Sequence, residues 1–415
     1  MSTKNMITDV VIIGAGAAGM FAAITAAQQG ARVLLLEKND RVGKKLAITG
    51  KGRCNVTNAC PAEEVLKNIP CNSKFLFSAI YRYPPESVMS FFEENGCALK
   101  IERGNRVFPT SDRSADIISA LERAMKKHKV ERRKANVTSL FVQEGKIAAV
   151  KTTEGIISAK RVILCTGGMS YPLTGSTGDG YAMAQAVGHT IVEPIGSLVP
   201  LNAESDCAKM QGLSLRNTRV RLLNAKKKVV FEDFGELLFT HFGLSGPTIL
   251  SASAHMKKNE TYTIELDLKP ALDEQKLDAR FLRDFEKYAN RSMENALADL
   301  YPTSMIPVLL ERCQIDPTSK ANSLTKVQRR ALLEQTKSFQ IRIDGVRDVQ
   351  EAIITRGGVS VKEIDPKTMQ SKLVEGLYFA GEILDCDAYT GGFNLQIAWS
   401  TAYCAASACV QAMQD

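Results

Sequence analysis

The sequence predicts an α/β protein with a buried parallel sheet, into which a second region is inserted. An uncharged apolar run from Val10 to Ala27 is interrupted by Gly14, Gly16 and Gly19, as expected for a strand, a tight turn and a helix. A second strand-like run near the carboxyl terminus also ends in glycines. The segment from about 196 to 347 has neither feature, so we expect it to separate two halves of the sheet domain.

The first glycines predict a phosphate site. Asp9 stands directly before the apolar run, where a secretory signal would carry positive charge, and so many glycines disfavour a membrane helix. Val10–Ile13 are therefore expected to form a buried parallel strand that turns at Gly14. Gly16 leaves room for a pyrophosphate, and Gly19 lets the next helix pack on the strand. The N-terminus of that helix offers unpaired N–H groups to the phosphate.

An acidic residue follows the second expected strand. Val33–Leu36 lead to Glu37, about twenty residues beyond the glycines, where a carboxylate can accept hydrogen bonds from ribose hydroxyls. Glu37 disfavours a 2′-phosphate, but the same pattern serves both FAD and NAD. A glycine-rich turn without a nucleotide is the alternative, and the agreement of strand, glycines, helix and acid argues against it.

The composition is that of a soluble globular chain of two or three domains. Of the 415 residues, 45% are hydrophobic, and no later uncharged apolar run reaches bilayer length, so no membrane partner is expected. The ten cysteines contain no CxxC pair, which predicts reduced thiols and no metal site. The N-terminus lacks a cleavage pattern, which makes the cytoplasm the expected location.

The formal net charge of +8 comes from short basic clusters. Examples are Lys126–Lys127, Arg132–Lys134 and Lys226–Lys228, and no aromatic residues are interleaved with them. Such clusters favour solvated faces, because a basic balance without a binding motif is only an electrostatic footprint. Nucleic acid is therefore not the expected partner.

Regular elements follow the first motif. Ser111–His128 has helical apolar spacing and closing lysines, so a helix is expected. Three strand-like runs, NVTSLFV, KIAAVKTT and IISAKRVILCTGG, are split by Glu-Gly pairs and predict a β-meander. The last run enters Thr166, Gly167 and Gly168, where a ligand can approach the backbone closely. GSTGDGYAMAQAVGH then predicts a phosphate-side loop and a helix that ends at Gly188.

The carboxyl-terminal stretch from Gly376 to Met413 carries a second set of glycines. Its first part predicts a buried strand that closes at Gly381 and Glu382. Gly391 and Gly392 would allow a tight approach, and Asn394 is expected to cap a long apolar helix. The positive end of that helix could face an anionic reduced flavin ring. A helix that only closes the core is the alternative.

The inserted region predicts a β subdomain followed by helices. TRVRLLNA, KKVVFED, ELLFTH and TYTIELDL have strand composition, and Leu272–Phe339 has helical spacing broken at Pro302 and Pro317. FTHFGLSGPTIL is expected to start a helix at Pro247, whose fixed backbone angle suits that position.

Taken with these motifs, the chain resembles the BaiN-like (YhiN-like) flavoproteins, a family that includes aminoacetone oxidase and a bile-acid dehydro-reductase. It is similar, more distantly, to fumarate-reductase-type flavoproteins. The resemblance spans nearly the whole chain and rests on GAGAAG with Glu37, KLAITGKGRCNVTN, GSTGDG, FTHFGLSGP, ITRGGV and GLYFAGEILDCDAYTGGFNLQ. It implies an α/β fold with a glutathione-reductase-type FAD-binding Rossmann-like domain, an inserted β subdomain and a helical cap.

The resemblance also implies boundaries and a set of FAD contacts. Residues 1–195 and 353–415 would form the FAD-binding domain, 196–271 the β subdomain, 272–338 the helical insert, and 339–352 the return strand of the β subdomain. Many relatives carry a third glycine where this chain has Lys51. The implied FAD contacts, from the pyrophosphate and ribose to the flavin ring, are Gly14, Gly16, Ala17, Ala18, Gly19, Glu37, Lys38, Thr49, Gly50, Gly52, Arg53, Cys54, Asn55, Val137, Thr166, Gly167, Gly381, Glu382, Gly392, Phe393, Asn394 and Leu395.

Few side chains suggest a catalytic role. His241 is the one histidine considered for proton transfer, because its ordinary pKa near ~6.5 makes it useful at neutral pH. The alternative is that it only forms hydrogen bonds at a turn between the domains. Cys54 could be redox-active, but no resolving cysteine stands in CxxC spacing, which favours a structural or flavin-packing role. Tyr389 and Asn55 could orient a substrate.

These observations predict an FAD-dependent oxidoreductase. Hydride would pass between a non-covalently bound flavin and a small organic substrate in a pocket beneath the inserted region. NADH or NADPH would act as a transient donor, because no second glycine fingerprint would hold it permanently. One alternative is an amine or aminoacetone oxidase that passes electrons to oxygen. Another is a flavin-bearing regulatory or nucleic-acid-associated protein.

Overall fold

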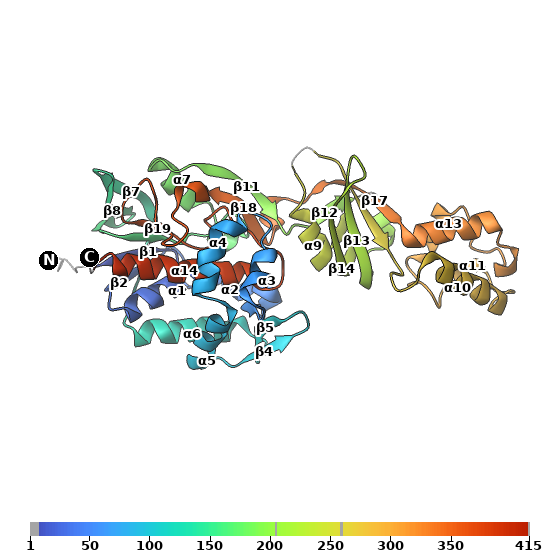
Figure 1. The fold of residues 1–415 in the computed structure, drawn as a ribbon, viewed down its shortest axis with the longest axis horizontal. Helices are drawn as coiled ribbons and strands as arrows, with labels where there is room; N and C mark the ends of the chain where they lie inside the picture. Colours follow the sequence, from blue (N-terminus) through green and yellow to red (C-terminus); the bar gives the residue numbers. More distant parts are fainter. Residues whose placement is uncertain (1–7, 204–205, 258–259, 414–415) are drawn as a thin grey trace. The chain divides into compact units, whose positions relative to one another are not determined.

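The computed structural model describes residues 8–203, 206–257 and 260–413. The chain divides into two compact units. Unit 1 comprises Met1–Ser197 together with Val349–Asp415, and unit 2 comprises Leu198–Asp348. In the colour ramp of Figure 1, unit 1 therefore combines blue to green segments with orange-red and red ones, whereas unit 2 runs from yellow-green to orange.

A five-stranded parallel sheet forms the centre of unit 1, in the order β19-β10-β1-β2-β6. Its three central strands are apolar and almost fully buried, as expected for a parallel sheet covered on both faces. The parallel α/β fold predicted from the sequence is confirmed. The strands are β1 (Val10–Ile13), β2 (Val33–Glu37), β6 (Glu131–Lys134), β10 (Val162–Leu164) and β19 (Leu377–Phe379).

Two apolar helices from opposite ends of the sequence pack together beside this sheet. α1 (Ala17–Gln28) follows β1, and α14 (Phe393–Gln411) follows β19. Both helices are buried over most of their circumference, so their apolar residues extend all round. Figure 1 shows the blue and red helices crossing the same region of unit 1. The two glycine-rich turns that precede these helices therefore belong to one core.

Smaller sheets and helices complete unit 1. Three antiparallel sheets consist of β3-β5-β4, β7-β8-β9 and β11-β18. Their strands are β3 (Thr57–Asn58), β4 (Leu99–Glu102), β5 (Arg106–Pro109), β7 (Val137–Gln143), β8 (Lys146–Thr152), β9 (Gly155–Ser158), β11 (Ile191–Ser197) and β18 (Ile354–Val359). The further α-helices are α2 (Lys44–Ile48), α3 (Ala62–Lys67), α4 (Ser73–Arg82), α5 (Pro85–Glu94), α6 (Ser114–Lys127) and α7 (Asp179–Ala186).

The run IISAKRVILCTGG forms two strands in two different sheets. β9 pairs with β8 in the meander, whereas β10 pairs with β1 and β19 in the parallel sheet. The intervening residues 159–161 redirect the chain between them. Composition could not reveal this break, because both strands are apolar.

Unit 2 combines a closed six-stranded barrel with a group of helices. The barrel order is β12-β15-β14-β13-β16-β17, and the runs KKVVFED and ELLFTH form one continuous strand, β14. Figure 1 shows α10, α11 and α13 grouped beyond one end of this barrel. The elements are β12 (Leu201–Ala203), α8 (Asp206–Lys209), β13 (Ser214–Asn224), β14 (Val229–Thr240), β15 (Gly243–Ser245), α9 (Pro247–Ser253), β16 (Tyr262–Asp267), α10 (Glu274–Lys287), α11 (Met293–Ala296), α12 (Ile306–Arg312), α13 (Lys326–Lys337) and β17 (Phe339–Val346).

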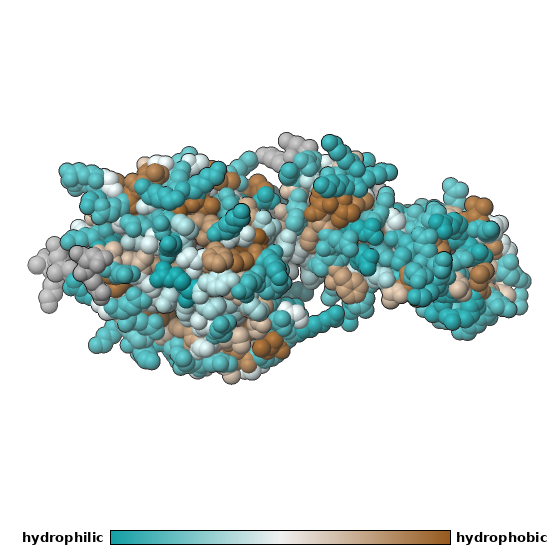
Figure 2. Space-filling model, in the orientation of Figure 1, coloured by the Kyte–Doolittle hydropathy of each residue, from teal (hydrophilic) through white to brown (hydrophobic). Residues whose placement is uncertain are grey.

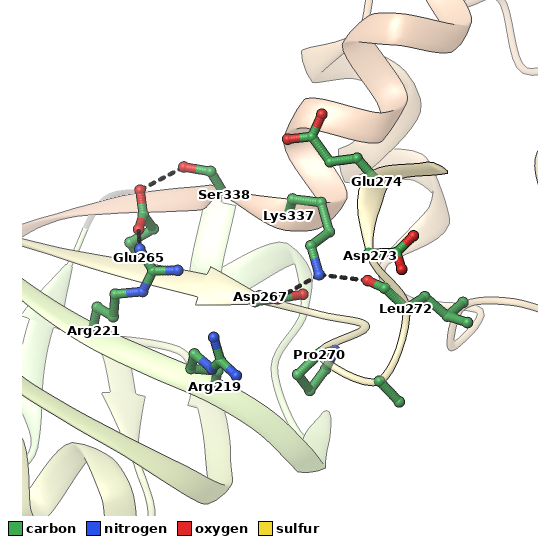
Figure 3. Close-up of a pocket in the computed structure, with 11 residues that line it drawn as sticks. Arg219, Arg221, Glu265, Asp267, Pro270, Leu272, Asp273, Glu274, Lys337 and Ser338 are labelled. Atoms are coloured by element: carbon green, nitrogen blue, oxygen red, sulfur yellow. Dashed lines mark hydrogen bonds and ion pairs between the residues drawn. The ribbon is translucent and has the colours of Figure 1, made fainter. Parts of the chain in front are cut away.

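A buried ion pair connects the barrel of unit 2 to its helices. The Lys337 ammonium, at the end of α13, lies 2.6 Å from the Asp267 carboxylate at the end of β16. It also donates to the backbone carbonyl oxygens of Leu272, at 2.7 Å, and Lys269, at 3.2 Å. Figure 3 shows this arrangement beside a cavity of about 570 Å³. All three donor positions of Lys337 are thus used where the chain enters and leaves the helical segment.

The face drawn in Figure 2 is mostly hydrophilic. On the face shown in Figure 2, apolar side chains form separate patches. Among the described residues, no helix combines the length and the apolar character needed to cross a bilayer.

Replacing Lys337 with methionine should strongly destabilise unit 2. The Asp267 side chain is 5% exposed, so it would be left as a buried charge without its partner, which typically costs about 3–5 kcal/mol. The matched control is Lys276→Met, which removes an exposed pair with Asp273 at 3.1 Å. Urea unfolding followed by circular dichroism measures both. Equal unfolding midpoints for the two variants would contradict this account of the connection.

Candidate functional site

The loop after β1 lies against the end of β10. Gly14 has a φ of +98°, and a Cβ on it would lie 2.6 Å from the Cys165 carbonyl oxygen. A Cβ on Gly19 would lie 1.7 Å from the Gly14 carbonyl oxygen, so α1 packs directly on this turn. Gly16 caps α1 without a side-chain hydrogen bond. The N–H groups of the first turn therefore have no side-chain acceptor, which is the arrangement that binds phosphate.

Glu37 connects this loop to the end of β2. Its carboxylate accepts hydrogen bonds from the Ala15 backbone N–H at 2.7 Å and from the Asn39 backbone N–H at 2.8 Å. A cavity of about 100 Å³ lies beside it, between the carboxyl ends of β2 and β6. Lys38 points elsewhere, because its ammonium pairs with Asp179 at 2.5 Å. Of the two residues assigned to the adenosine ribose, only Glu37 lines this cavity. The cavity is lined by Glu37, Asn39, Asp40, Val42, Arg132, Arg133 and Lys134.

The loop from Thr49 to Asn55 is built from left-handed backbone. Gly50 has a φ of +56°, Lys51 of +59° and Cys54 of +61°. The Cys54 N–H donates to the Thr49 carbonyl oxygen at 2.9 Å and closes the loop. Lys51 thus adopts a left-handed conformation that glycine takes up without strain, so a glycine would suit this position better.

The Arg53 side chain is directed to the small sheet of unit 1. Its guanidinium pairs with Asp112 at 2.5 Å and with Glu102, and it stacks over the Phe108 ring at 4.1 Å from the ring centroid. The charge of Arg53 is therefore already balanced by two carboxylates. The guanidinium of Arg53, which the resemblance places among the FAD contacts, is therefore already engaged within unit 1.

Cys54 is fully buried within this loop. Burial raises the pKa of its thiol to about 12, although a hydrogen bond with Thr49 acts in the opposite direction. A protonated, inaccessible thiol is a poor nucleophile. The packing role is thus the better supported of the two alternatives for Cys54.

The turn before α14 lies against β3. Gly391 and Gly392 have φ values of +125° and +99°, and a Cβ on Gly392 would lie 2.4 Å from the Thr57 carbonyl carbon and oxygen. Asn394 is not the N-cap: the cap is Gly392, and Asn394 lies inside the first turn. Its side chain accepts from the Ala388 N–H at 2.9 Å and donates to the Ala388 carbonyl oxygen at 2.7 Å. The prediction of an Asn394 cap was wrong because the residue fixes the preceding loop instead.

Buried hydrogen bonds hold α14 to the strand that follows the Thr49–Asn55 loop. The Thr57 hydroxyl donates to the Gln396 side-chain oxygen at 2.6 Å, and the Trp399 indole N–H donates to the Val56 carbonyl oxygen at 2.9 Å. Gln396 and Trp399 are both fully buried. The turn before α14 and the loop before β3 are therefore held in a fixed relation.

Lys45 lies beside Glu382 but was not among the predicted site residues. The Lys45 ammonium lies 2.6 Å from the Glu382 carboxylate and 2.7 Å from the Ser170 hydroxyl. Glu382 also accepts the Thr355 backbone N–H at 2.9 Å. This network joins the segments after β10 and β19 to α2. The position of Lys45 at the start of KLAITGKGRCNVTN was the available signal, but only the fold shows its partner.

Three polar atoms of unit 1 are buried without a partner in the part of the chain that the structure describes. They are the Asn55 Oδ1, Thr166 Oγ1 and Asp387 Oδ1 atoms. Each belongs to a segment at the edge of the glycine turns. Buried polar groups are rarely left unpaired, so such atoms point to a ligand or ordered water. The open amides and left-handed loops fit a phosphate, and the unpaired polar atoms fit hydroxyl or ring groups of a bound dinucleotide.

The remaining implied FAD contacts lie at the ends of strands and helices of unit 1. Val137 begins β7, and Thr166 and Gly167 follow β10. Gly381 lies two residues after the end of β19. Its backbone N–H donates to the Thr401 hydroxyl at 3.0 Å. The structure thus assigns Ala17, Ala18, Phe393 and Leu395 to the first turns of α1 and α14.

His241 belongs to unit 2, at the turn between β14 and β15. It is exposed, and its ring contacts Phe242 with centroids 5.0 Å apart. Within the described residues it has no hydrogen-bond partner to orient it as an acid or base. A catalytic His241 remains a proposal.

The fold and the glycine-lined loops define a Rossmann-type protein of the flavoenzyme class, and sequence comparison agrees. The family described as HI0933-like protein Rossmann domain matches residues 8–408. The 3-dehydro-bile acid delta(4,6)-reductase of Clostridium scindens is 31% identical over 411 residues, covering 96% of this chain and 98% of the relative. A ribosomal RNA dihydrouridine synthase of Escherichia coli is 30% identical over 403 residues, covering 96% and 97%.

Solved structures show the same fold. A flavocytochrome c3 fumarate reductase has a TM-score of 0.53 at 17% identity and covers 98% of this chain and 79% of its own. The 3-ketosteroid delta1-dehydrogenase of Sterolibacterium denitrificans has a TM-score of 0.51 at 13% identity and covers 98% and 99%. The chain belongs to the HI0933-like family, and the flavoprotein oxidoreductase class expected from the sequence is confirmed.

Replacing Gly392 with alanine should abolish flavin retention. The new Cβ would overlap the Thr57 backbone, which cannot move without displacing β3. The control is Gly30→Ala, because Gly30 has a similar φ of +92° but no atom within 4 Å of an added Cβ. Both variants carry the same backbone strain, and only Gly392→Ala carries the overlap. The ratio of flavin to protein absorbance after purification measures the effect, and equal ratios would contradict the assignment.

Proposed function

We propose that the protein is an FAD-dependent reductase that adds two hydrogens across a carbon–carbon double bond conjugated with a carbonyl group. The observation that supports the proposal is the pair of glycine turns before α1 and before α14, where a Cβ would overlap other main chain, together with the unpartnered polar atoms buried nearby. This arrangement suits a flavin dinucleotide. Bound FAD, once reduced, supplies a hydride.

The chain's own residues have distinct roles in this proposal. The first turn of α1 and the backbone of the Thr49–Asn55 loop hold the pyrophosphate, and Glu37 holds the adenosine ribose. The N-terminus of α14, whose first turn has no acidic residue, stabilises negative charge on the flavin ring. The buried, protonated Cys54 is unsuited to attachment, so FAD is bound non-covalently. Acid precipitation should leave the yellow colour in the supernatant.

The names of the relatives support the choice of reaction. A delta(4,6)-reductase removes ring double bonds from a 3-dehydro-bile acid. A dihydrouridine synthase saturates the uracil ring double bond. In both substrates the double bond is conjugated with a carbonyl group, which accepts the electrons as hydride is added. That shared chemistry is the part we extend to this chain.

The electron donor in this proposal is NADH or NADPH, which visits the site in turn with the substrate. Among its described residues, unit 1 contains one parallel sheet. It also contains one unit of the type that binds dinucleotides, in which a strand, a glycine turn and a helix follow one another. That unit is assigned to FAD, so a nicotinamide has no separate fold of this kind to occupy.

A base in RNA is a second candidate substrate. The observations that favour it are the formal charge of +8 and the two relatives named as ribosomal RNA dihydrouridine synthases. Binding to RNA through phosphates would weaken steeply with added salt, whereas binding of an uncharged ring substrate would not. Oxidation of an amine by oxygen is the remaining alternative, and peroxide formation would reveal it.

Anaerobic mixing with NADH or NADPH should bleach the flavin, and an unsaturated acceptor should restore its colour. The acceptors are a conjugated steroid enone and a uridine-containing RNA stem-loop, each at low and high salt. Mass spectrometry should find the addition of two hydrogens to one of them. The proposal would be contradicted if the flavin stayed oxidised with both nucleotides. It would also be contradicted if no saturated product formed from either acceptor.

A further inference from the structure

Two aspartates in the loop before α14 interact with an arginine of β18. This loop runs from Ile383 to Gly391, between β19 and α14, and carries Asp385 and Asp387. Arg356 of β18 interacts electrostatically with both carboxyl groups. Asn72, the residue directly before α4, donates a hydrogen bond to the Asp385 carboxylate. Two carboxyl groups therefore share one cation in a largely buried place.

Asp385 has more hydrogen-bond donors from other segments around its carboxyl group than Asp387 has. The Asn72 side chain donates to the Asp385 carboxylate at 3.0 Å and to its backbone carbonyl oxygen at 2.6 Å. The Gly357 backbone N–H is a second donor to the carboxylate, and Arg356 supplies positive charge. Burial still raises the pKa of Asp385, but these donors oppose it.

The surroundings of Asp387 favour its neutral form. Asp387 is 1% exposed, and its Oδ2 atom accepts one hydrogen bond, from the Ser197 hydroxyl at 2.7 Å. Its Oδ1 atom has no partner among the described residues. Burial is the main cause that raises the pKa of Asp387, and the nearby Asp385 adds to it, whereas Ser197 and Arg356 lower it.

The charged or titratable groups that interact with Asp387 among the described residues come from three segments. Arg356 comes from β18, and Asp385 and Cys386 from its own loop. Cys71, in the segment before α4, is close enough to interact with the Asp387 charge. Burial raises the pKa of both thiols, so neither carries charge at neutral pH. Among these named groups one arginine faces two carboxyl groups, so one proton shared by the pair would balance their charge.

We propose that this proton resides on Asp387, whose unpartnered Oδ1 presents it to the ligand bound at the glycine turns, and that Asp387 is the proton donor of the reaction. The inference rests on the proposed function and assigns a residue to it. Saturation of a double bond needs a hydride and a proton. The hydride comes from the reduced flavin, which a nicotinamide has reduced, and the proton comes from Asp387, which is left as a carboxylate and regains a proton from water.

The loop places this acid in a fixed position relative to α14. Asn394 holds Ala388 by two hydrogen bonds, and the Tyr389 N–H donates to the Asn68 carbonyl oxygen at 3.0 Å. Asp387 directly precedes Ala388. An acid held this firmly, out of contact with water, keeps its proton until an acceptor is presented. The competing explanation is a purely structural Asp387 that only fastens the end of β11 through Ser197.

The protonation state can be measured on the purified protein without reference to activity. Infrared spectroscopy at neutral pH should show a protonated carboxyl band that is absent in Asp387→Asn and retained in Asp385→Asn. The substitution is close to isosteric, and circular dichroism checks that each variant folds. A band unchanged in Asp387→Asn would overturn the inference.

The kinetic test isolates the proton-transfer step. Pre-reduced enzyme is mixed with the acceptor, and flavin reoxidation is followed as a function of pH. In the wild type the rate should fall as the pH rises through the pKa of Asp387, because the acid form is the active one. Asp387→Asn should be slower by about 10²–10⁴-fold and should lack this limb. Asp385→Asn should keep a pH-dependent limb.

A third variant separates proton donation from structural support. Ser197→Ala removes a hydrogen bond that stabilises the Asp387 carboxylate, so the pKa should rise and the falling limb should move to higher pH. A purely structural role would leave the limb in place. If the wild type reduces no acceptor, the proposed function fails while the infrared result stands. If it reduces an acceptor and Asp387→Asn matches it at every pH, only the further inference fails.

Discussion

Close contact between backbone segments is the constraint on which the rest of the site depends. The turn before α1 touches the end of β10, and the turn before α14 touches β3, with no space for a side chain at either place. Glycine is required at these points because the backbone is left-handed and a Cβ would overlap another main chain. We propose that the N-termini of α1 and α14 face one bound ligand. Phosphate binding and stabilisation of a flavin anion would both follow from that placement.

The polar groups around the turns are arranged by the same contacts. Lys45 and Glu382 join the segments that follow β10 and β19, and Gln396 and Trp399 hold α14 to the strand beside it. Each of these groups is paired with another part of unit 1, so it contributes rigidity. The unpaired atoms of Asn55, Thr166 and Asp387 are the exceptions, which makes them the informative ones.

The sequence predicted those helices and strands whose formation depends only on neighbouring residues. The strand and helix around Gly14, the end of β2 at Glu37, and the helix start at Pro247 all follow from patterns within a few residues. It failed where a distant partner decides the outcome. Asn394 has the residue type of a helix cap, but the Ala388 backbone takes its side chain, and Arg53 is neutralised by carboxylates about fifty residues away in the chain. Asp387 carried no local signal, because its burial and missing partner are properties of the fold.

The central claim is that turns far apart in the sequence form one FAD site. Hydrogen-exchange mass spectrometry with and without added FAD tests it directly, because exchange reports each segment separately. The account predicts that FAD slows exchange together in the peptides covering 14–19, 49–55 and 391–395, with one FAD bound per chain. Protection of only one of these segments, or of none, would contradict it.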